Sequence, residues 1–355
     1  PCIRALEHAA DLAVLAPSVH NTQPWTIVMH VDRMEFRADR SRQLGALDPQ
    51  GRALAQSVGA ALLNARVALA AEDWAVEVDR FPSPSDPELL AVVRPVTGHP
   101  DSGLASLAPA VEQRRTNRRH FGPAPVPEHV LRLLTVAAAD EETALVPVIQ
   151  EQHRRLVARL TQQADEAQNA SPAYRAELRR WTTRPADAGD GVPGSVVPHV
   201  DGDSGDDVPL RDFDTQGRAG LPGRTGSGVE QTLVLLATYA DDPPSWLRSG
   251  EALQRVLLEL TRLGWVASPV TQAIEVPVTR TRLRSALTWD AHPQMLLRIG
   301  LAEPTGPVPR RPRDDTVTGS WQPPCPGPDA IPQGRSISTT RHPESDGRGG
   351  TTWVG

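Results

Sequence analysis

Residues 16–25 read APSVHNTQPW, and this stretch is the most informative part of the chain about its fold. It follows residues 3–15, which place apolar side chains at helical spacing, and it precedes residues 26–31, which are typical of a strand. Pro17 ends the helix, so a turn must follow. A turn with few large apolar side chains lets the backbone approach a flat ligand closely. The alternative is an ordinary proline-bounded turn with a packed tryptophan.

A second notable stretch is RRTNRRHF, residues 114–121, at the end of a helix predicted over residues 104–115. Arginines near the carboxyl end of a helix interact favourably with its dipole, so a solvated helix end is one interpretation. The planar guanidinium group also suits phosphate and carboxylate recognition, which favours an anion site.

Hydrophobic periodicity predicts helices and strands in two successive groups. The first group has a helix at 3–15, strands at 26–31 and 34–38, a long apolar helix at 52–71 and a strand at 75–81. The second has helices at 104–115, 128–139, 150–169, 172–181 and 246–263, and strands at 144–149, 229–238 and 295–301.

These groups predict two related halves, residues 1–100 and 101–315. Residues 182–228 are rich in Gly, Pro and Asp without periodicity, which predicts a long loop that acts as a lid or an insertion. Residues 316–355 are rich in Pro, Gly, Ser and Thr, and we expect a disordered tail there.

Composition excludes several classes of function. The formal net charge is -6, and all 37 residues counted as Lys+Arg are arginine, so lysine Schiff bases and phosphate-loop lysines are ruled out. An acidic chain without a basic tract argues against nucleic acid as a partner. No stretch approaches the roughly 20 apolar residues of a membrane span, so we expect a cytoplasmic protein without a membrane partner. Cys2 and Cys325 lie far apart, which predicts free thiols and no metal site.

The first stretch resembles the A-P-S-x-x-N-x-Q-P-W segment of the nitroreductase and flavin reductase family. RRTNRRHF is similar to the R-R-S-x-R-x-F segment of the same family, and the likeness runs from about residue 4 to residue 315. Each half keeps one segment and lacks the other, as in the Acg-type FMN-binding oxidoreductases of actinobacteria. The resemblance implies an α+β nitroreductase-like fold with two related halves fused as a pseudo-dimer. It also implies one intact flavin site and a monomer able to bind FMN.

Position by position, the resemblance implies a set of FMN contacts. Those from the first stretch, near the ring or ribityl chain, are Pro17, Ser18, Val19 and Asn21. Those near the phosphate and ribityl end are Arg114, Arg115 and Thr116, and those over the ring are Pro269, Val270 and Thr271. Arg118 replaces the lysine that family members place near flavin N1 and O2. Arg310 and Arg311 match a basic position that reaches the phosphate, although they could also be a solvated patch ahead of the tail.

Two functions remain open at this point. As an enzyme, the protein would pass hydride from NAD(P)H through FMN to a small-molecule acceptor such as a nitroaromatic or a quinone. As a binding protein, it would sequester or store FMN beneath the lid. The sequence offers no evident acid, base or nucleophile constellation, so we assign no catalytic residue, as fits chemistry carried by a cofactor.

Overall fold

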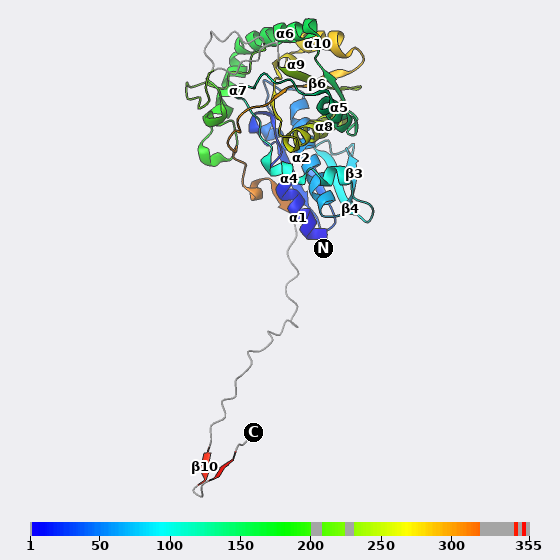
Figure 1. Cartoon of the computed structure of the whole chain (residues 1–355), viewed down its shortest axis with the longest axis vertical. Coiled ribbons are helices and arrows are strands. Elements are labelled where there is room, and N and C mark those ends of the chain that lie inside the picture. Colours follow the sequence, from blue (N-terminus) through cyan, green and yellow to red (C-terminus); the bar gives the residue numbers. More distant parts are fainter. Residues whose placement is uncertain (1, 200–207, 224–230, 320–343, 347–349, 353–355) are drawn as a thin grey trace. The chain divides into compact units, whose positions relative to one another are not determined.

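The computed structural model describes most of the chain, namely residues 2–199, 208–223, 231–319, 344–346 and 350–352. The chain divides into two compact units, Pro1–Gly319 and Ser320–Gly355 (Figure 1). In the second unit, β10 (Glu344–Asp346) pairs antiparallel with β11 (Gly350–Thr352). All of the predicted site residues lie in the first unit.

The first half contains one mainly antiparallel sheet and one long helix. Its elements are α1 (Cys2–Ala13), β1 (Trp25–Met29), β2 (Met34–Ala38), α2 (Arg52–Ala71), β3 (Ala75–Arg80) and β4 (Leu89–Val96). The strands lie in the order β3-β4-β2-β1, and each neighbouring pair is antiparallel. In β1, buried and partly buried residues alternate, because successive side chains of a strand point to opposite faces of the sheet.

The second half repeats this plan. Its elements are α5 (Glu128–Ala139), β5 (Ala144–Pro147), α6 (Glu151–Asn169), α7 (Pro172–Thr182), β6 (Thr232–Thr238), α8 (Pro243–Arg262), β7 (Val266–Pro269), α9 (Gln272–Glu275), α10 (Pro277–Leu283) and β8 (His292–Gly300). The strands lie in the order β7-β8-β6-β5, again antiparallel.

The two halves therefore share one topology. In chain order, each half has a helix, two strands, a long helix and two more strands. In each sheet the third strand of that half lies beside the fourth, the fourth beside the second, and the second beside the first. The second half differs by two insertions: α6, α7 and the following loop lie between its first two strands, and α9 and α10 lie between its last two. The prediction of an α+β fold built from two related halves is confirmed.

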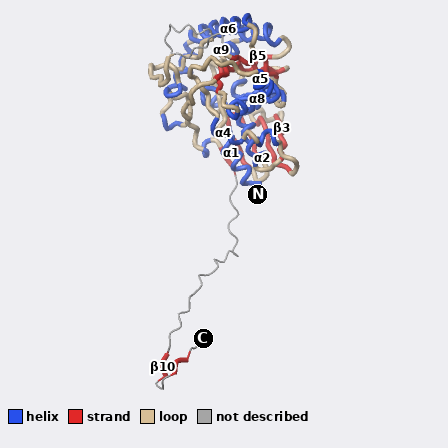
Figure 2. The backbone as a smooth tube through the Cα atoms, in the orientation of Figure 1, coloured by secondary structure: helices blue, strands red, loops and turns tan. Residues whose placement is uncertain are grey.

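The long helices of the two halves, α2 and α8, pack against each other at the centre of the unit (Figures 1 and 2). Both are 20 residues long, and each has a glycine as its eighth residue, Gly59 in α2 and Gly250 in α8. A Cβ atom on Gly59 would lie 2.1 Å from the Leu247 carbonyl oxygen, and one on Gly250 would lie 2.1 Å from that of Gln56. Glycine thus permits the close approach of the two helix backbones.

Helix α2 is the core helix of the first half. It is long and apolar enough to cross a membrane by length and composition, but 89% of the relevant window is buried inside the protein. The structure therefore explains its hydrophobicity by packing against α1 and α8.

Buried charges also join the halves. The carboxylate of Glu251 in α8 is fully buried and accepts hydrogen bonds of 2.7 Å from Arg66 in α2 and Arg80 in β3. Arg66 donates in addition to Glu141, at 2.6 Å. A buried carboxylate needs such partners because burial without them would be very costly.

The end of the first unit returns to the first half. Residues 317–319, which the sequence analysis assigned to the tail, form β9 (Val317–Gly319), which pairs parallel with β1. The Ile27 amide donates to the Thr316 carbonyl oxygen at 2.8 Å, so the free edge of β1 accounts for this difference. Residues 320–343 of the predicted tail lie outside the described residues.

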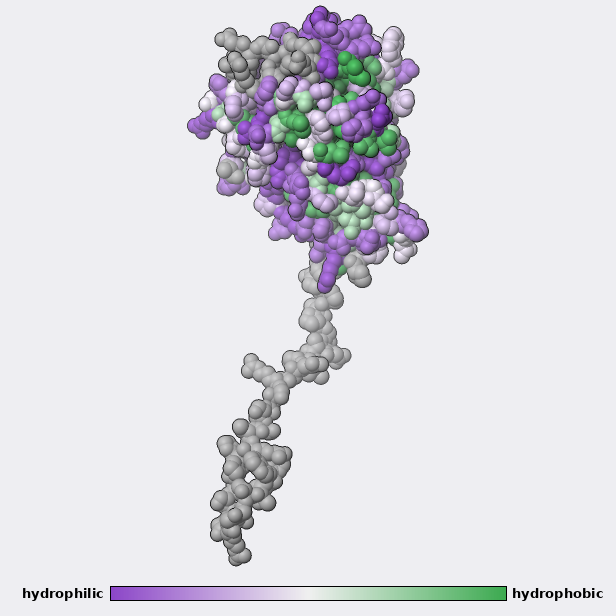
Figure 3. Space-filling view, in the orientation of Figure 1, coloured by the Kyte–Doolittle hydropathy of each residue, from purple (hydrophilic) through white to green (hydrophobic). Residues whose placement is uncertain are grey.

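The visible surface of the first unit is mixed, with hydrophilic residues predominating (Figure 3). Hydrophobic residues gather near α5, where Leu133 is 45% and Val136 is 59% exposed. Both are apolar positions on the outward face of a helix whose other face, with Val130 and Leu134, is buried.

Candidate functional site

The loop formed by the APSVHNTQPW stretch connects α1 to β1, and its backbone is unusual. His20, Asn21 and Gln23 have left-handed φ values of 47°, 55° and 49°. Such conformations cost free energy in residues other than glycine and persist where surrounding contacts fix them. One such contact is the Gln23 amide, which donates to Ser18 Oγ at 2.9 Å.

Two polar side chains of this loop connect it to distant segments. Asn21 Nδ2 donates to the Gly191 carbonyl at 3.0 Å and to the Pro309 carbonyl at 3.1 Å. Gln23 Nε2 donates to the Gly189 carbonyl at 2.8 Å. The loop therefore fixes both the start of the predicted lid and the segment that follows β8.

Two adjoining cavities meet at this loop, and both are lined by Pro17, Ser18, Thr116 and Arg118. We call them the inner cavity and the arginine cavity. Each encloses about 1010 Å³ of empty space, including space open to solvent.

The arginine cavity is lined by Arg114, Arg115 and Arg310, together with Asn21. Arg114 is only 4% exposed, and its Nε and Nη1 atoms are buried without a hydrogen-bond partner. Glu112 also lines the cavity, but within the described part of the chain no carboxylate is in ion-pair contact with these three arginines. Buried cations of this kind normally require an anionic partner.

The electrostatics agree with that requirement. Burial, together with the charges of Arg310 and Arg115, lowers the pKa of Arg114 to about 9. Burial and the charge of Arg115 lower the pKa of Arg310 to about 10. An anion in the cavity would relieve both effects, because an opposite charge stabilises the protonated guanidinium.

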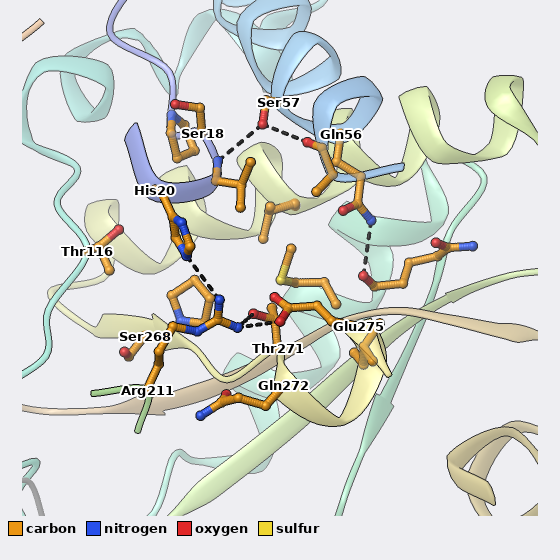
Figure 4. Close-up of a pocket in the computed structure, with 18 of the residues that line it drawn as sticks. Ser18, His20, Gln56, Ser57, Thr116, Arg211, Ser268, Thr271, Gln272 and Glu275 are labelled. Atoms are coloured by element: carbon orange, nitrogen blue, oxygen red, sulfur yellow. Dashed lines mark hydrogen bonds and ion pairs between the residues drawn. The ribbon is translucent and has the colours of Figure 1, made fainter. Parts of the chain in front are cut away.

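The inner cavity has an apolar floor and polar walls (Figure 4). Leu253, Leu257 and Met295 supply apolar surface from α8 and β8. Arg52, Gln56 and Ser57 line it from α2, and Ser268, Pro269, Thr271, Gln272, Ile274 and Glu275 line it from β7 and α9. An apolar chamber with a few convergent polar groups is typical of a site for a planar organic ligand.

The predicted lid reaches this cavity. Leu210, Arg211 and Phe213 line it, and Arg211 forms an ion pair with Glu275 of α9. The Arg118 guanidinium lies over the Phe213 ring, 4.8 Å from its centroid. Burial and the charge of Arg211 lower the pKa of Arg118 to about 10.

A second contact fixes the lid nearer its start. The Asp190 carboxylate accepts from Arg184 Nε at 2.6 Å and forms a further ion pair with Arg42. Burial raises the pKa of Asp190, but these two guanidinium groups outweigh it and hold that pKa below its usual value. The lid is therefore attached to the first half at Arg42 and to the second half at Glu275. Among the described residues, no group of three or more His, Cys, Asp or Glu is placed to hold a metal ion.

Comparison with known proteins identifies the family. No family model matches the chain. Two Mycobacterium tuberculosis proteins carry the provisional names NAD(P)H nitroreductase Rv3131 and NAD(P)H nitroreductase acg. The first is 35% identical over 323 residues, spanning 88% of this chain and 90% of that protein. The second is 33% identical over 317 residues, spanning 87% and 94%. The chain belongs to this Acg-type nitroreductase family, as the two sequence motifs predicted.

Solved structures show a more distant likeness. A nitroreductase with bound FMN from Desulfitobacterium hafniense is 14% identical, with 60% of this chain and 96% of that chain covered and a TM-score of 0.38. The FMN- and NADPH-dependent nitroreductase NfnB from a Sphingopyxis strain is 21% identical, covering 61% and 98%, also with a TM-score of 0.38.

The structure brings together most of the residues predicted from the family resemblance. Pro17, Ser18, Thr116 and Arg118 line both cavities, Val19, Pro269 and Thr271 line the inner cavity, and Asn21, Arg114, Arg115 and Arg310 line the arginine cavity. Residues of the two sequence motifs thus line two adjoining cavities, which share four of them.

Val270 and Arg311 differ from that expectation, because neither lines the inner cavity or the arginine cavity. Val270 is 1% exposed and packs in the second half's core. Arg311 Nη1 donates to the Gln23 carbonyl at 3.1 Å, and its Nη2 donates to the Asp315 carbonyl at 2.8 Å. Each residue follows one that does line a cavity, and successive side chains of a non-helical segment point in different directions.

Several lining residues escaped the sequence analysis, notably His20, Arg52, Gln56, Arg211 and Glu275. Gln56 offered a signal, since it is one of the few polar residues in a helix built mainly of apolar and small residues, and a buried amide normally has a polar partner. His20 lay in the first motif and was given no role. The lid segment offered no such signal, because its sequence has no hydrophobic periodicity.

Proposed function

We propose that this chain binds one FMN and acts as a nitroreductase-type oxidoreductase, transferring hydride from NAD(P)H to a nitroaromatic or quinone-type acceptor. The observation that carries the proposal is Arg114, a buried guanidinium with two unpartnered nitrogen atoms, in a cavity that adjoins a largely apolar one. A ligand with an anionic end and a flat organic end satisfies both cavities.

The residues present fit FMN. Arg114, Arg115 and Arg310 would hold the phosphate, since arginine binds phosphate with several charge-assisted hydrogen bonds. Pro17, Ser18 and Val19 would lie against the ring or the ribityl chain, with Thr116 where the two cavities meet.

When bound, FMN supplies the hydride chemistry. The protein binds and orients the flavin, and its charged groups influence how easily the ring is reduced. Arg118 and Arg52 are cations on the wall of the inner cavity. A fixed positive charge there stabilises negative charge that accumulates on reduction. Of the two, Arg118 is the one that the family resemblance places near N1 and O2.

We also propose that a monomer is sufficient for binding. Both motifs that line the cavities belong to one chain, so no second copy is needed to complete the site. Size-exclusion chromatography with absorbance detection at about 450 nm, where oxidised flavin absorbs, should show flavin in the monomer peak. An obligate dimer that loses FMN on dissociation would contradict this.

A second candidate function is FMN sequestration, and the lid contacts favour it. Leu210, Arg211 and Phe213 line the inner cavity, where a nicotinamide or an acceptor would have to enter. A lid of this kind can also assist catalysis by excluding water and opening between steps. The lid contacts therefore make sequestration a candidate function beside catalysis.

Two experiments test the proposal. The ultraviolet-visible spectrum of the purified protein should show bound flavin, or should show it after incubation with FMN, whereas a preparation that takes up no FMN would refute the proposal. Anaerobic stopped-flow mixing with excess NADH or NADPH should then bleach the flavin within seconds in an oxidoreductase. Flavin that stays oxidised with both donors would favour sequestration.

A further inference from the structure

His20 lies on the wall of the inner cavity and is held tightly (Figure 4). Its side chain is buried, with 7% of the residue exposed, and its backbone is in the left-handed region. The Phe213 ring of the lid meets it edge to face, with ring centroids 5.4 Å apart and an interplanar angle of 85°. The ring orientation is therefore set by its surroundings.

The contact with the lid also determines which nitrogen carries the proton. Nε2 of His20 lies 3.0 Å from Nη1 of Arg211 (Figure 4). A guanidinium group has only donors, so Nε2 must accept and the proton of the neutral ring must be on Nδ1. Burial, together with the charges of Arg211 and Arg118, lowers the pKa of His20 well below its usual value, which agrees with a neutral ring.

Arg211 is itself held in place for this contact. It forms an ion pair with Glu275 and lies 3.5 Å from Thr271 Oγ1, and both partners line the same cavity. The lid thus supplies a rigid donor to His20.

The Nδ1 atom of His20 is buried and has no hydrogen-bond partner among the described residues. A buried N–H without an acceptor costs free energy, and native proteins rarely leave one unless a ligand or water completes it. Since His20 lines the inner cavity, a bound ligand can supply the missing acceptor.

We propose that His20 is a cofactor-contacting residue whose Nδ1–H, fixed by the contact with Arg211, donates a hydrogen bond to an acceptor atom on the rim of the flavin ring. This rests on the proposed function. The ring becomes more electron-rich on reduction, so the donor stabilises the reduced form more than the oxidised form. By fixing this donor, the contact from Arg211 raises the reduction potential of the flavin.

The first test concerns the tautomer and needs no flavin. Long-range proton–nitrogen correlation spectra of the full-length protein without FMN should show one histidine with a protonated Nδ1 and an unprotonated Nε2, absent from the H20N variant. In the R211Q variant, the Nε2–H tautomer should gain population. An Nε2–H tautomer for His20 in the unmutated protein would overturn the inference.

The second test is the midpoint potential of the FMN-bound protein. H20F keeps an aromatic ring against Phe213 but removes the donor, and H20N keeps a donor on a residue that tolerates left-handed backbone. We expect H20F to make reduction about tenfold less favourable, which is about 30 mV for a two-electron couple. The midpoint potential of H20N should lie closer to that of the unmutated protein. The control H129F, at an exposed position, should have the same midpoint potential as the unmutated protein.

Equal potentials in H20F, H20N and the unmutated protein would show that His20 does not contact the ring. If H20F does not fold, the tautomer populations of His20 in the unmutated protein and in R211Q still test the inference, because they require neither FMN nor H20F. A protein that binds no FMN would refute the proposed function, while the tautomer measurement would still stand.

Discussion

At the scale of single residues, the site is defined by charges that the fold buries without pairing them. Arg114 is the clearest case, because its guanidinium has two unpartnered atoms and a lowered pKa. Residues that bind a ligand are often unfavourable for stability when the ligand is absent. Function and stability should therefore respond in opposite directions when this charge is removed.

We predict that R114Q lowers FMN affinity by roughly 10- to 100-fold, the worth of a charge-assisted hydrogen bond, and does not lower the stability of the FMN-free protein. Titration with FMN followed by fluorescence quenching gives the first quantity, and urea unfolding gives the second. The control is R132Q, which removes an exposed arginine paired with Glu128 on α5. Unchanged affinity in R114Q would place the phosphate elsewhere.

A second residue-scale prediction concerns Asp48, which precedes α2 and accepts from the Leu54 amide at 2.9 Å. Burial raises its pKa from 3.8 to about 6, although the backbone hydrogen bonds of α2 oppose the shift. A raised folded-state pKa gives stability that is present below the unfolded value and lost as pH rises through the folded value. As pH rises from 4 to 7, ionisation of Asp48 should therefore cost the folded protein about 2 kcal/mol of stability.

The D48N variant does not titrate at this position, so its stability relative to the unmutated protein should improve by that amount as pH rises from 4 to 7. Urea unfolding of both proteins at several pH values measures the difference, and effects of other groups cancel. D79N, at an exposed position on β3, serves as the control. A difference that is constant with pH would mean that Asp48 is not destabilised when ionised.

At the scale of elements, periodicity located most helices and strands, and it failed where a local feature overrode it. The helix predicted over 104–115 is two short helices, α3 (Ser102–Ala105) and α4 (Ala108–Gln113), because Pro109 lacks an N–H and is favourable only in a first helical turn. Strand β4 was missed, although it is an apolar run. Its Pro95 lies beyond the end of the β2 pairing, so the missing N–H leaves that ladder intact.

The site was predictable where a contiguous motif carried it, and not where separate segments converge. The APSVHNTQPW and RRTNRRHF stretches located most of the lining residues, because each is read from adjacent positions. Arg211 and Glu275 meet from segments 64 residues apart, and only tertiary packing places them together. The same holds for Arg52, which reaches the Ile274 carbonyl at 3.0 Å.

The lid gives the prediction at this scale. E275Q removes the charge that pairs with the buried Arg211, and breaking a buried ion pair typically costs about 3–5 kcal/mol. The lid contact should weaken, and NAD(P)H should reduce the flavin at least about tenfold faster if the lid limits access. Anaerobic stopped-flow absorbance measures this rate, with E151Q, which removes an exposed ion pair with Arg155 on α6, as the control. An unchanged rate in E275Q, with the same flavin content, would show that the lid does not gate the site.

At the scale of the whole molecule, the site depends on how the two halves are held together. The first half provides the motif loop and α2, and the second provides Thr116, Arg118 and the β7–α9 segment. Neither half alone encloses the inner cavity. The relative position of the halves is set where α2 crosses α8, at Gly59 and Gly250, close to the site residue Gln56.

This crossing leads to the prediction that G59A and G250A each destabilise the protein by about 3 kcal/mol or more, because the new methyl group must displace backbone atoms of the other helix. At Gly250 the added Cβ would lie 2.6 Å from the Gln56 Cα as well as 2.1 Å from its carbonyl oxygen. Urea unfolding gives the stability, and FMN titration should show weaker binding in the variants that still fold, since Gln56 moves with the crossing. G306A is the matched control, because nothing lies within 4 Å of its added Cβ. The two changes act on one contact, so the double variant should cost less than their sum. Unfolding free energies equal to that of G306A would mean that the helices can separate without loss, and that something other than the α2–α8 crossing fixes the halves around the site.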